Sequence, residues 1–272
     1  MTSAELSYRS SIIHYYQGGT PGAPLLICFH GYGESGASFA LLEKHLGGQF
    51  MICAPDLPFH GQTRWEEGLD CSPAQLLEIL GLISGRPSLE GPGIILAGYS
   101  LGGRVALGIY ALLPGQVRAL LLVAPDGLRV NPWYRLATRT GWGNALFKWL
   151  MKQGRFFTGV VSLLGRSHLV NQSFYKFVRH YVNSERVRHE LYVRWTTLRH
   201  FGPQRREIRE LVKKHNTPVR LVYGEYDRII PPASGRAFTE ETAPFTTMTL
   251  LAAGHQLLQE KHAAQICALL KN

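Results

Sequence analysis

The segment Gly98-Tyr99-Ser100-Leu101-Gly102 constrains this 272-residue chain more than any other. An apolar run, residues 93–97, enters it, and a helical pattern, Leu101–Leu113, leaves it. A strand that feeds a helix through so tight a turn holds the middle residue in a strained conformation, with its side chain above the sheet edge. Glycines at both ends let the strand and the helix pass closely. The segment therefore predicts that Ser100 is a nucleophile.

A serine hydroxyl needs a base beside it, and His255 is the best candidate among the eleven histidines. It follows the predicted strand Phe245–Leu251, and Gly254 before it allows a sharp turn. We expect its imidazole to point back toward Ser100 from a loop just past the end of that strand.

The base needs a carboxylate to orient it, and Asp227 is the preferred candidate. It lies in the loop after the predicted strand Val219–Tyr223. Asp126 is a rival because it follows another predicted strand in the same way, and Glu225 is a weaker rival. With Asp227 the chain order is serine, acid, histidine, as expected for a nucleophile on a strand-to-helix turn.

Backbone N–H groups near Ser100 are predicted to hold developing negative charge. A glycine-rich turn, residues 30–33, follows the predicted strand Leu25–Phe29 and offers the N–H of Tyr32. The second donor is the N–H of Leu101, directly after the nucleophile. We expect His30 to hold loops by hydrogen bonds rather than to carry protons. The residues predicted to contact a substrate at this edge are His30, Gly31, Tyr99 and Arg104.

The remaining pattern predicts an α/β fold with a doubly wound, mostly parallel sheet. Continuous apolar runs suit strands that are covered on both faces, and helical stretches alternate with them. In such sheets the site lies at the carboxyl ends of the strands. The predicted strands are Ser10–Tyr16, Leu25–Phe29, Met51–Ala54, Gly93–Ala97, Ala119–Ala124, Val219–Tyr223 and Phe245–Leu251.

Taken together, these segments resemble the α/β-hydrolase superfamily over nearly the whole chain. The matching motifs are His30-Gly31 and residues 56–61, 98–103, 224–227 and 254–255. Phe59 departs from the pattern, because many relatives have glycine before the His-Gly pair. Epoxide hydrolases and haloalkane dehalogenases look similar but carry aspartate as the nucleophile, so Ser100 argues against both. The resemblance implies a serine nucleophile that needs neither a metal ion nor an organic cofactor.

Between residues 128 and 214 the strand pattern stops. Helical patterns occur at Asn144–Met151, Ser173–Tyr181, Glu185–His200 and Gln204–Lys214. The resemblance implies that this insertion is a helical cap over the site, where substrate choice is decided. The predicted organisation is a core of residues 1–127 and 215–272, with a cap of residues 128–214.

The basic character of the chain lies in that insertion. The chain has a net charge of +10, whereas residues 128–215 hold eighteen Lys and Arg against four Glu, a net of +14. One interpretation is attraction of a small anionic substrate. Another is transient contact with an anionic membrane surface, with Phe156, Phe157, Phe174 and Phe177 as apolar contacts. A solvated surface is the third; nucleic acid is disfavoured because no binding motif is present. No obligate protein partner is evident.

Arg104 bears on substrate choice, because helical geometry places it about one turn after Ser100. Residues 98–104 resemble the same segment of the menaquinone-pathway SHCHC synthases, whose arginine at this place belongs to an anion-binding site. The alternative is an ion pair on the helix surface.

The sequence thus predicts a serine hydrolase that cleaves an ester-like acyl bond through an acyl-enzyme. A lyase or carbon–carbon hydrolase with the same residues, or a ligand-binding protein with a slow triad, are the alternatives. A hydrophobic fraction of 45% and a charged fraction of 18% suit a folded soluble protein. The four cysteines lack metal-ligand spacing, and the N-terminus lacks the apolar core of a signal peptide, so we expect a cytoplasmic location.

Overall fold

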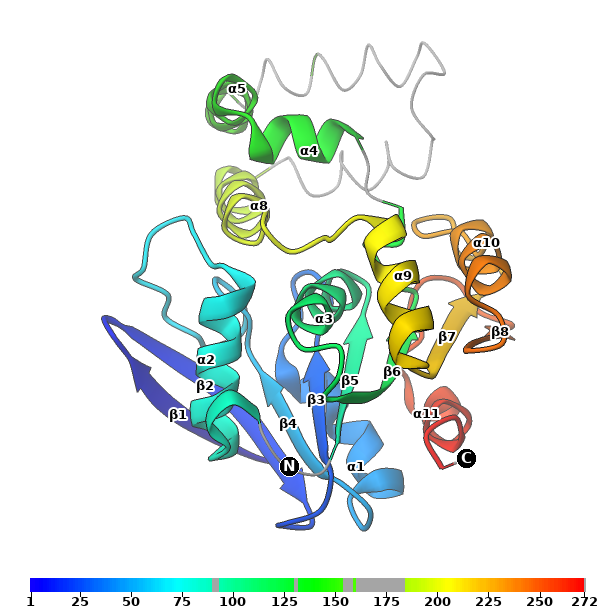
Figure 1. Ribbon diagram of the computed structural model, residues 1–272. Helices are drawn as coiled ribbons and strands as arrows, with labels where there is room; N and C mark the ends of the chain where they lie inside the picture. Colours follow the sequence, from blue (N-terminus) through cyan, green and yellow to red (C-terminus); the bar gives the residue numbers. More distant parts are fainter. Residues whose placement is uncertain (90–92, 130–131, 154–158, 160–183, 272) are drawn as a thin grey trace. The chain divides into compact units, whose positions relative to one another are not determined.

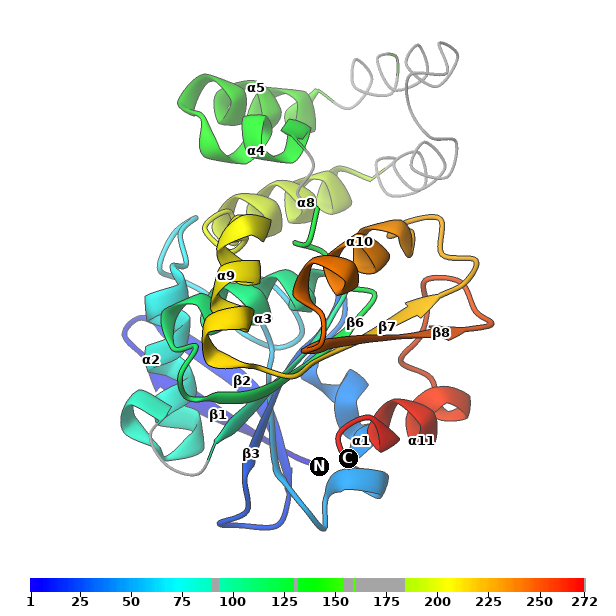
Figure 2. The same ribbon diagram turned by 45° about the vertical axis from the view of Figure 1, so that its right-hand side comes forward.

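A computed structural model describes residues 1–89, 93–129, 132–153, 159 and 184–271 of the chain (Figures 1 and 2). They divide into two compact units. The main unit comprises residues 1–129 and 200–272, and the second unit comprises residues 130–199. No helix among these residues is long and apolar enough to cross a membrane.

A sheet of eight strands, as far as the described residues go, forms the centre of the main unit, in the order β1-β2-β4-β3-β5-β6-β7-β8. β1 and β2 pair antiparallel, as do β2 and β4, and all other neighbours are parallel. This confirms the predicted mostly parallel sheet. The strands are β1 (Thr2–Tyr8), β2 (Ser11–Gly19), β3 (Leu25–Phe29), β4 (Met51–Pro55), β5 (Ile94–Tyr99), β6 (Val117–Val123), β7 (Val219–Gly224) and β8 (Thr246–Leu251).

Helices cover both faces of this sheet, with α1 and α11 together on one face and α2, α3 and α9 on the other (Figures 1 and 2). Every residue of β3 and of β5 is buried, as expected for strands between two helical layers. The helices of this unit are α1 (Ala40–Leu46), α2 (Pro73–Ser84), α3 (Leu101–Leu112), α9 (Arg205–His215), α10 (Ala233–Thr242) and α11 (Glu260–Ala268), with short 3₁₀ turns at Gly36–Phe39 and Pro87–Leu89.

The edge strand β1 is absent from the expected set of strands. It forms a hairpin with β2, in which Tyr8 pairs with Ser11. Most of its residues are exposed, and only Tyr8 is buried. An exposed edge strand needs no continuous apolar run, so hydrophobic pattern alone does not reveal it.

The second unit contains α4 (Pro132–Arg139), α5 (Gly141–Lys152) and α8 (Glu185–Thr197). Aromatic rings join them: the ring centroids of Tyr134 and Trp195 are 5.3 Å apart, and those of Phe147 and Tyr192 are 5.5 Å apart. The predicted helix at Ser173–Tyr181 and the four phenylalanines proposed as membrane contacts lie outside the described residues.

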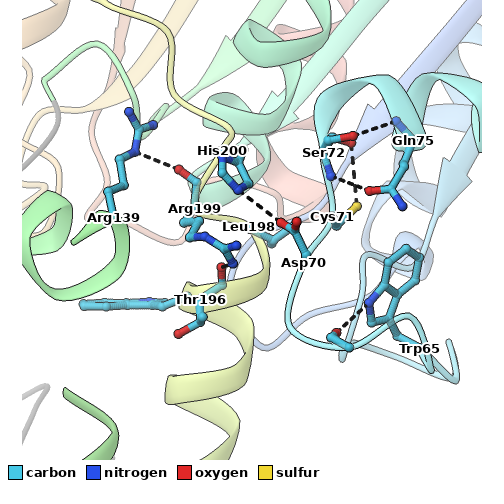
Figure 3. A network of polar contacts seen from close by, with 12 residues as sticks. Trp65, Asp70, Cys71, Ser72, Gln75, Arg139, Thr196, Leu198, Arg199 and His200 are labelled. Carbon is cyan, nitrogen blue, oxygen red and sulfur yellow. Dashed lines mark hydrogen bonds and ion pairs between the residues drawn. The ribbon is translucent and has the colours of Figure 1, made fainter. Parts of the chain in front are cut away.

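The predicted cap, residues 128–214, is longer than this second unit at its C-terminal end. Helix α9 lies within the main unit, where it packs against α3 and α10. The main unit resumes at His200, whose Nε2 lies 3.1 Å from Asp70 Oδ1 (Figure 3). Shortly after Asp70, Ser72 caps α2 through reciprocal hydrogen bonds with Gln75. Within the second unit, Arg139 Nε donates to the Arg199 carbonyl at 2.9 Å.

The crossing of β5 into α3 requires glycine at two positions. A Cβ on Gly98 would lie 2.4 Å from the Gly102 carbonyl oxygen. A Cβ on Gly102 would lie 1.9 Å from the Phe29 carbonyl oxygen of β3. Both contacts are to backbone, which has little freedom to move away inside a buried sheet.

We expect Gly102→Ala to destabilise the main unit by about 1–3 kcal/mol, because the added methyl group overpacks a buried crossing. Gly48→Ala is the matched control, since a Cβ there meets nothing within 4 Å. The control should stay within about 0.5 kcal/mol of wild type. Urea denaturation of the three proteins measures both effects, and equal midpoints would contradict the proposed steric constraint.

Candidate active site

Ser100 adopts the strained conformation that its motif predicts. Its φ is 52° and its ψ is −114°, values that non-glycine residues rarely take. Three backbone hydrogen bonds hold it there. Its N–H donates to Val123 at 3.0 Å, and its carbonyl accepts from Gly103 at 2.9 Å and from Asp126 at 2.8 Å. The strain therefore belongs to the strand-to-helix turn and fixes where the hydroxyl stands.

The structure brings Ser100, His255 and Asp227 into one hydrogen-bonded chain. His255 Nε2 lies 3.0 Å from Ser100 Oγ, and His255 Nδ1 lies 2.7 Å from Asp227 Oδ2. With Nδ1 donating to the carboxylate, Nε2 is left to accept the serine proton.

The Asp227 carboxylate is fully buried and fixed by the loop after β7. Its Oδ1 accepts the N–H groups of Ile229 at 2.8 Å and Ile230 at 2.9 Å. Both oxygens are therefore engaged, one by backbone and one by His255. A carboxylate held in this way can fix the imidazole tautomer and stabilise an imidazolium.

The carboxylate that contacts His255 is that of Asp227 and not that of a rival acid. The Asp126 carboxylate forms an ion pair with Arg104. Glu225 is exposed, and its backbone N–H donates to Leu251 at 2.8 Å. Arg104, one of the residues predicted to contact a substrate, is 5% exposed and forms this ion pair below the surface, and its contact with a substrate stays a prediction.

His30 joins two loops below the site. It is fully buried, its Nδ1 lies 2.8 Å from the Gly31 carbonyl oxygen, and its Nε2 accepts the Leu57 N–H at 3.0 Å. This is the arrangement expected of a residue that holds loops. Phe59, the position that departs from the family pattern, has φ 62° and so adopts the left-handed conformation that glycine favours.

The two predicted oxyanion donors follow neighbouring strands. β3 and β5 pair in parallel, with Phe29 opposite Gly98, so the turn that carries Tyr32 lies beside the turn that carries Leu101. Leu101 is the first residue of α3, and N–H groups in the first turn of a helix have no partner within the helix. The partial positive charge at this end favours an oxyanion. Both roles stay predictions.

Tyr99 and Glu34 extend the site beneath the base. Tyr99 was expected to contact a substrate, but it is 3% exposed and its hydroxyl donates to the His255 carbonyl at 3.0 Å. Glu34 escaped the sequence analysis, although a carboxyl two residues after a predicted oxyanion donor was a usable signal. Burial raises the pKa of Glu34, and the Ser38 hydroxyl, the Gly31 backbone and His255 partly offset that rise.

Other nucleophiles and metal ligands are poorly placed. All four cysteines are free and buried, and burial raises the thiol pKa of Cys53 and Cys71 to about 12. Such thiols carry little thiolate at neutral pH. Within the described ranges, no group of three His, Cys, Asp or Glu side chains could hold a metal ion.

Comparisons with known proteins bear on the family and the fold of this chain. Residues 26–269 match the model of the alpha/beta hydrolase family. The uncharacterized hydrolase YugF of Bacillus subtilis (strain 168) is 24% identical over 261 residues, which cover 92% of this chain and 89% of that protein. A pimeloyl-[acyl-carrier protein] methyl ester esterase of Xanthomonas axonopodis pv. citri (strain 306) is 26% identical over 242 residues, covering 85% and 88%. The thioesterase domain from the curacin biosynthetic pathway shares the fold, with a TM-score of 0.66 at 18% identity over 100% of this chain and 99% of that one.

We expect Asp227→Asn to slow the reaction of Ser100 with a fluorophosphonate probe by roughly 10⁴-fold, because a neutral partner no longer fixes the imidazole tautomer. Asp126→Asn should change the rate much less, since Asp126 pairs with Arg104 rather than with His255. Labelling rates measured by mass spectrometry rank the two variants. The reverse ranking would move the orienting role to Asp126.

Proposed function

The chain belongs to the alpha/beta hydrolase family, and we propose that it is a serine hydrolase that cleaves an ester-like acyl bond of a small substrate through an acyl-enzyme. The observation that carries this proposal is the hydrogen-bonded chain Ser100–His255–Asp227, with distances of 3.0 and 2.7 Å. It joins a nucleophile, a base and an orienting carboxylate.

In the first half of the proposed reaction, Ser100 Oγ attacks the acyl carbonyl carbon while His255 Nε2 takes the serine proton. The N–H groups of Tyr32 and Leu101 hold the oxyanion of the tetrahedral intermediate. His255 then passes its proton to the leaving alcohol oxygen as the bond to the acyl carbon breaks. Asp227 stabilises the imidazolium form of His255 between these two proton transfers.

In the second half, water attacks the Ser100 ester and His255 takes a proton from that water. The new intermediate collapses, the carboxylic acid leaves, and the proton returns to Ser100 Oγ. All the groups needed come from the chain itself, so the proposal requires neither a metal ion nor an organic cofactor.

The choice of an ester over other acyl bonds is supported by the similarity to one related protein. The pimeloyl-[acyl-carrier protein] methyl ester esterase aligns over most of its own length, which makes a carboxylic ester the first substrate class to test. A lyase or carbon–carbon hydrolase would use the same three residues for proton transfer, and a binding protein would keep them with little turnover. Reaction with a fluorophosphonate separates the binding protein from the enzymes.

Ser100→Ala should lower kcat for a small p-nitrophenyl ester by about 10⁴-fold or more, because loss of one member removes the function of the whole triad. The protein should keep its wild-type circular dichroism spectrum and melting temperature. Wild-type esterase activity in Ser100→Ala would refute the proposal.

We further propose that the substrate is anionic, because the second unit is strongly basic. Residues 130–199 contain twelve Lys and Arg against two Glu. Such a field raises the encounter rate with anions, and salt weakens it over a screening length of about 10 Å at 0.1 M and about 3 Å at 1 M. Arg104 is already paired with Asp126, so we assign this attraction to the other cations of the chain.

We therefore expect kcat/KM for a carboxylate-bearing ester to fall as salt rises from about 0.02 to 1 M, while a neutral ester of similar size changes little. The two esters are assayed at one pH. Parallel salt curves would contradict an anionic substrate. Sedimentation with anionic and neutral lipid vesicles would then separate a membrane-surface contact from a solvated surface.

A further inference from the structure

Tyr99 touches His255 in two ways. Its hydroxyl donates to the His255 main-chain carbonyl at 3.0 Å. Its ring lies beside the imidazole, with centroids 5.6 Å apart and an angle of 31° between the planes. Burial raises the pKa of Tyr99, so the phenol remains a neutral donor at working pH. One buried side chain thus contacts both the backbone and the ring of the base.

The position of Tyr99 in the chain makes this contact consequential. Tyr99 is the last residue of β5 and directly precedes Ser100. The same short segment therefore carries the nucleophile and forms a hydrogen bond to the loop that carries the base. On its other side that loop is held by the backbone N–H of Tyr226, which donates to Ala253 at 3.0 Å.

Glu34 lies behind Tyr99 in the turn after β3. A Cβ built on Gly31 would lie 3.0 Å from the Tyr99 ring and 3.4 Å from Glu34 Cδ, so glycine leaves room for both groups at this point. Glu34 Oε2 is buried and accepts no hydrogen bond in the part of the chain that the structure describes.

We propose that Tyr99 is a positioning residue for His255 and fixes the main chain of the base. The proposal rests on the proposed function of His255 as general base. Asp227 orients the ring through Nδ1, but a ring hydrogen bond leaves the loop backbone free to shift. The Tyr99 hydroxyl restrains that backbone and so preserves the 3.0 Å approach of Nε2 to Ser100.

Tyr99→Phe removes only the hydroxyl. We expect kcat for a p-nitrophenyl ester to fall about 10- to 100-fold with KM little changed, because small misplacements of a catalytic group carry costs of this order. Tyr110→Phe is the matched control, since Tyr110 is also buried and its hydroxyl donates to Thr217 Oγ1 at 2.9 Å, outside the site. The control should lose similar stability but keep wild-type kcat. Equal kcat in the two variants would overturn the role of Tyr99.

Failure of the proposed function would show differently, as wild-type protein that neither hydrolyses esters nor reacts with the fluorophosphonate.

Discussion

The strained turn at Ser100 is the constraint on which the rest of the site depends. A non-glycine residue at φ 52° and ψ −114° costs about 1–3 kcal/mol and persists only where its surroundings impose it. Here they do so through backbone bonds to Val123, Gly103 and Asp126. These hydrogen bonds come from the end of β6, from α3 and from the loop after β6. The sheet and the helix together therefore fix the position of the Ser100 hydroxyl. The fold must therefore place the base and its orienting carboxylate next to the Ser100 hydroxyl.

The order of the strands in the sheet determines how far His255 starts from Ser100. Ser100 follows β5 and His255 follows β8, and the two strands are separated by β6 and β7. At about 4.8 Å per strand the gap is about 14 Å, which an imidazole cannot cross alone. The chain after β8 therefore bends back along the sheet edge, where Tyr226 N–H and the Tyr99 hydroxyl both bond it. The Tyr99 side chain suits this role because it is long and extends toward the His255 loop from the strand that precedes Ser100.

Hydrophobic pattern and motif context predicted the parallel sheet, and the three residues they selected for catalysis stand in one hydrogen-bonded chain. What escaped them has physical reasons. β1 is an exposed edge that needs no apolar run. The pairing of Asp126 with Arg104, one turn along α3, depends on tertiary geometry that a linear sequence does not display. The closeness of Glu34 to Tyr99 and its partial burial arise only in the folded chain, so a linear sequence does not display them.

The candidate catalytic residues and most of the basic charge of this chain lie in different units. Ser100, Asp227 and His255 all come from residues 1–129 and 200–272, as do Tyr99 and Glu34. The excess of Lys and Arg lies in residues 130–199. Because long-range attraction depends on net charge and not on atomic contacts, the charge of the second unit can change without disturbing the hydrogen bonds of the triad. The proposed catalytic residues and the proposed attraction of anions can therefore be tested by separate substitutions, because they depend on different parts of the chain.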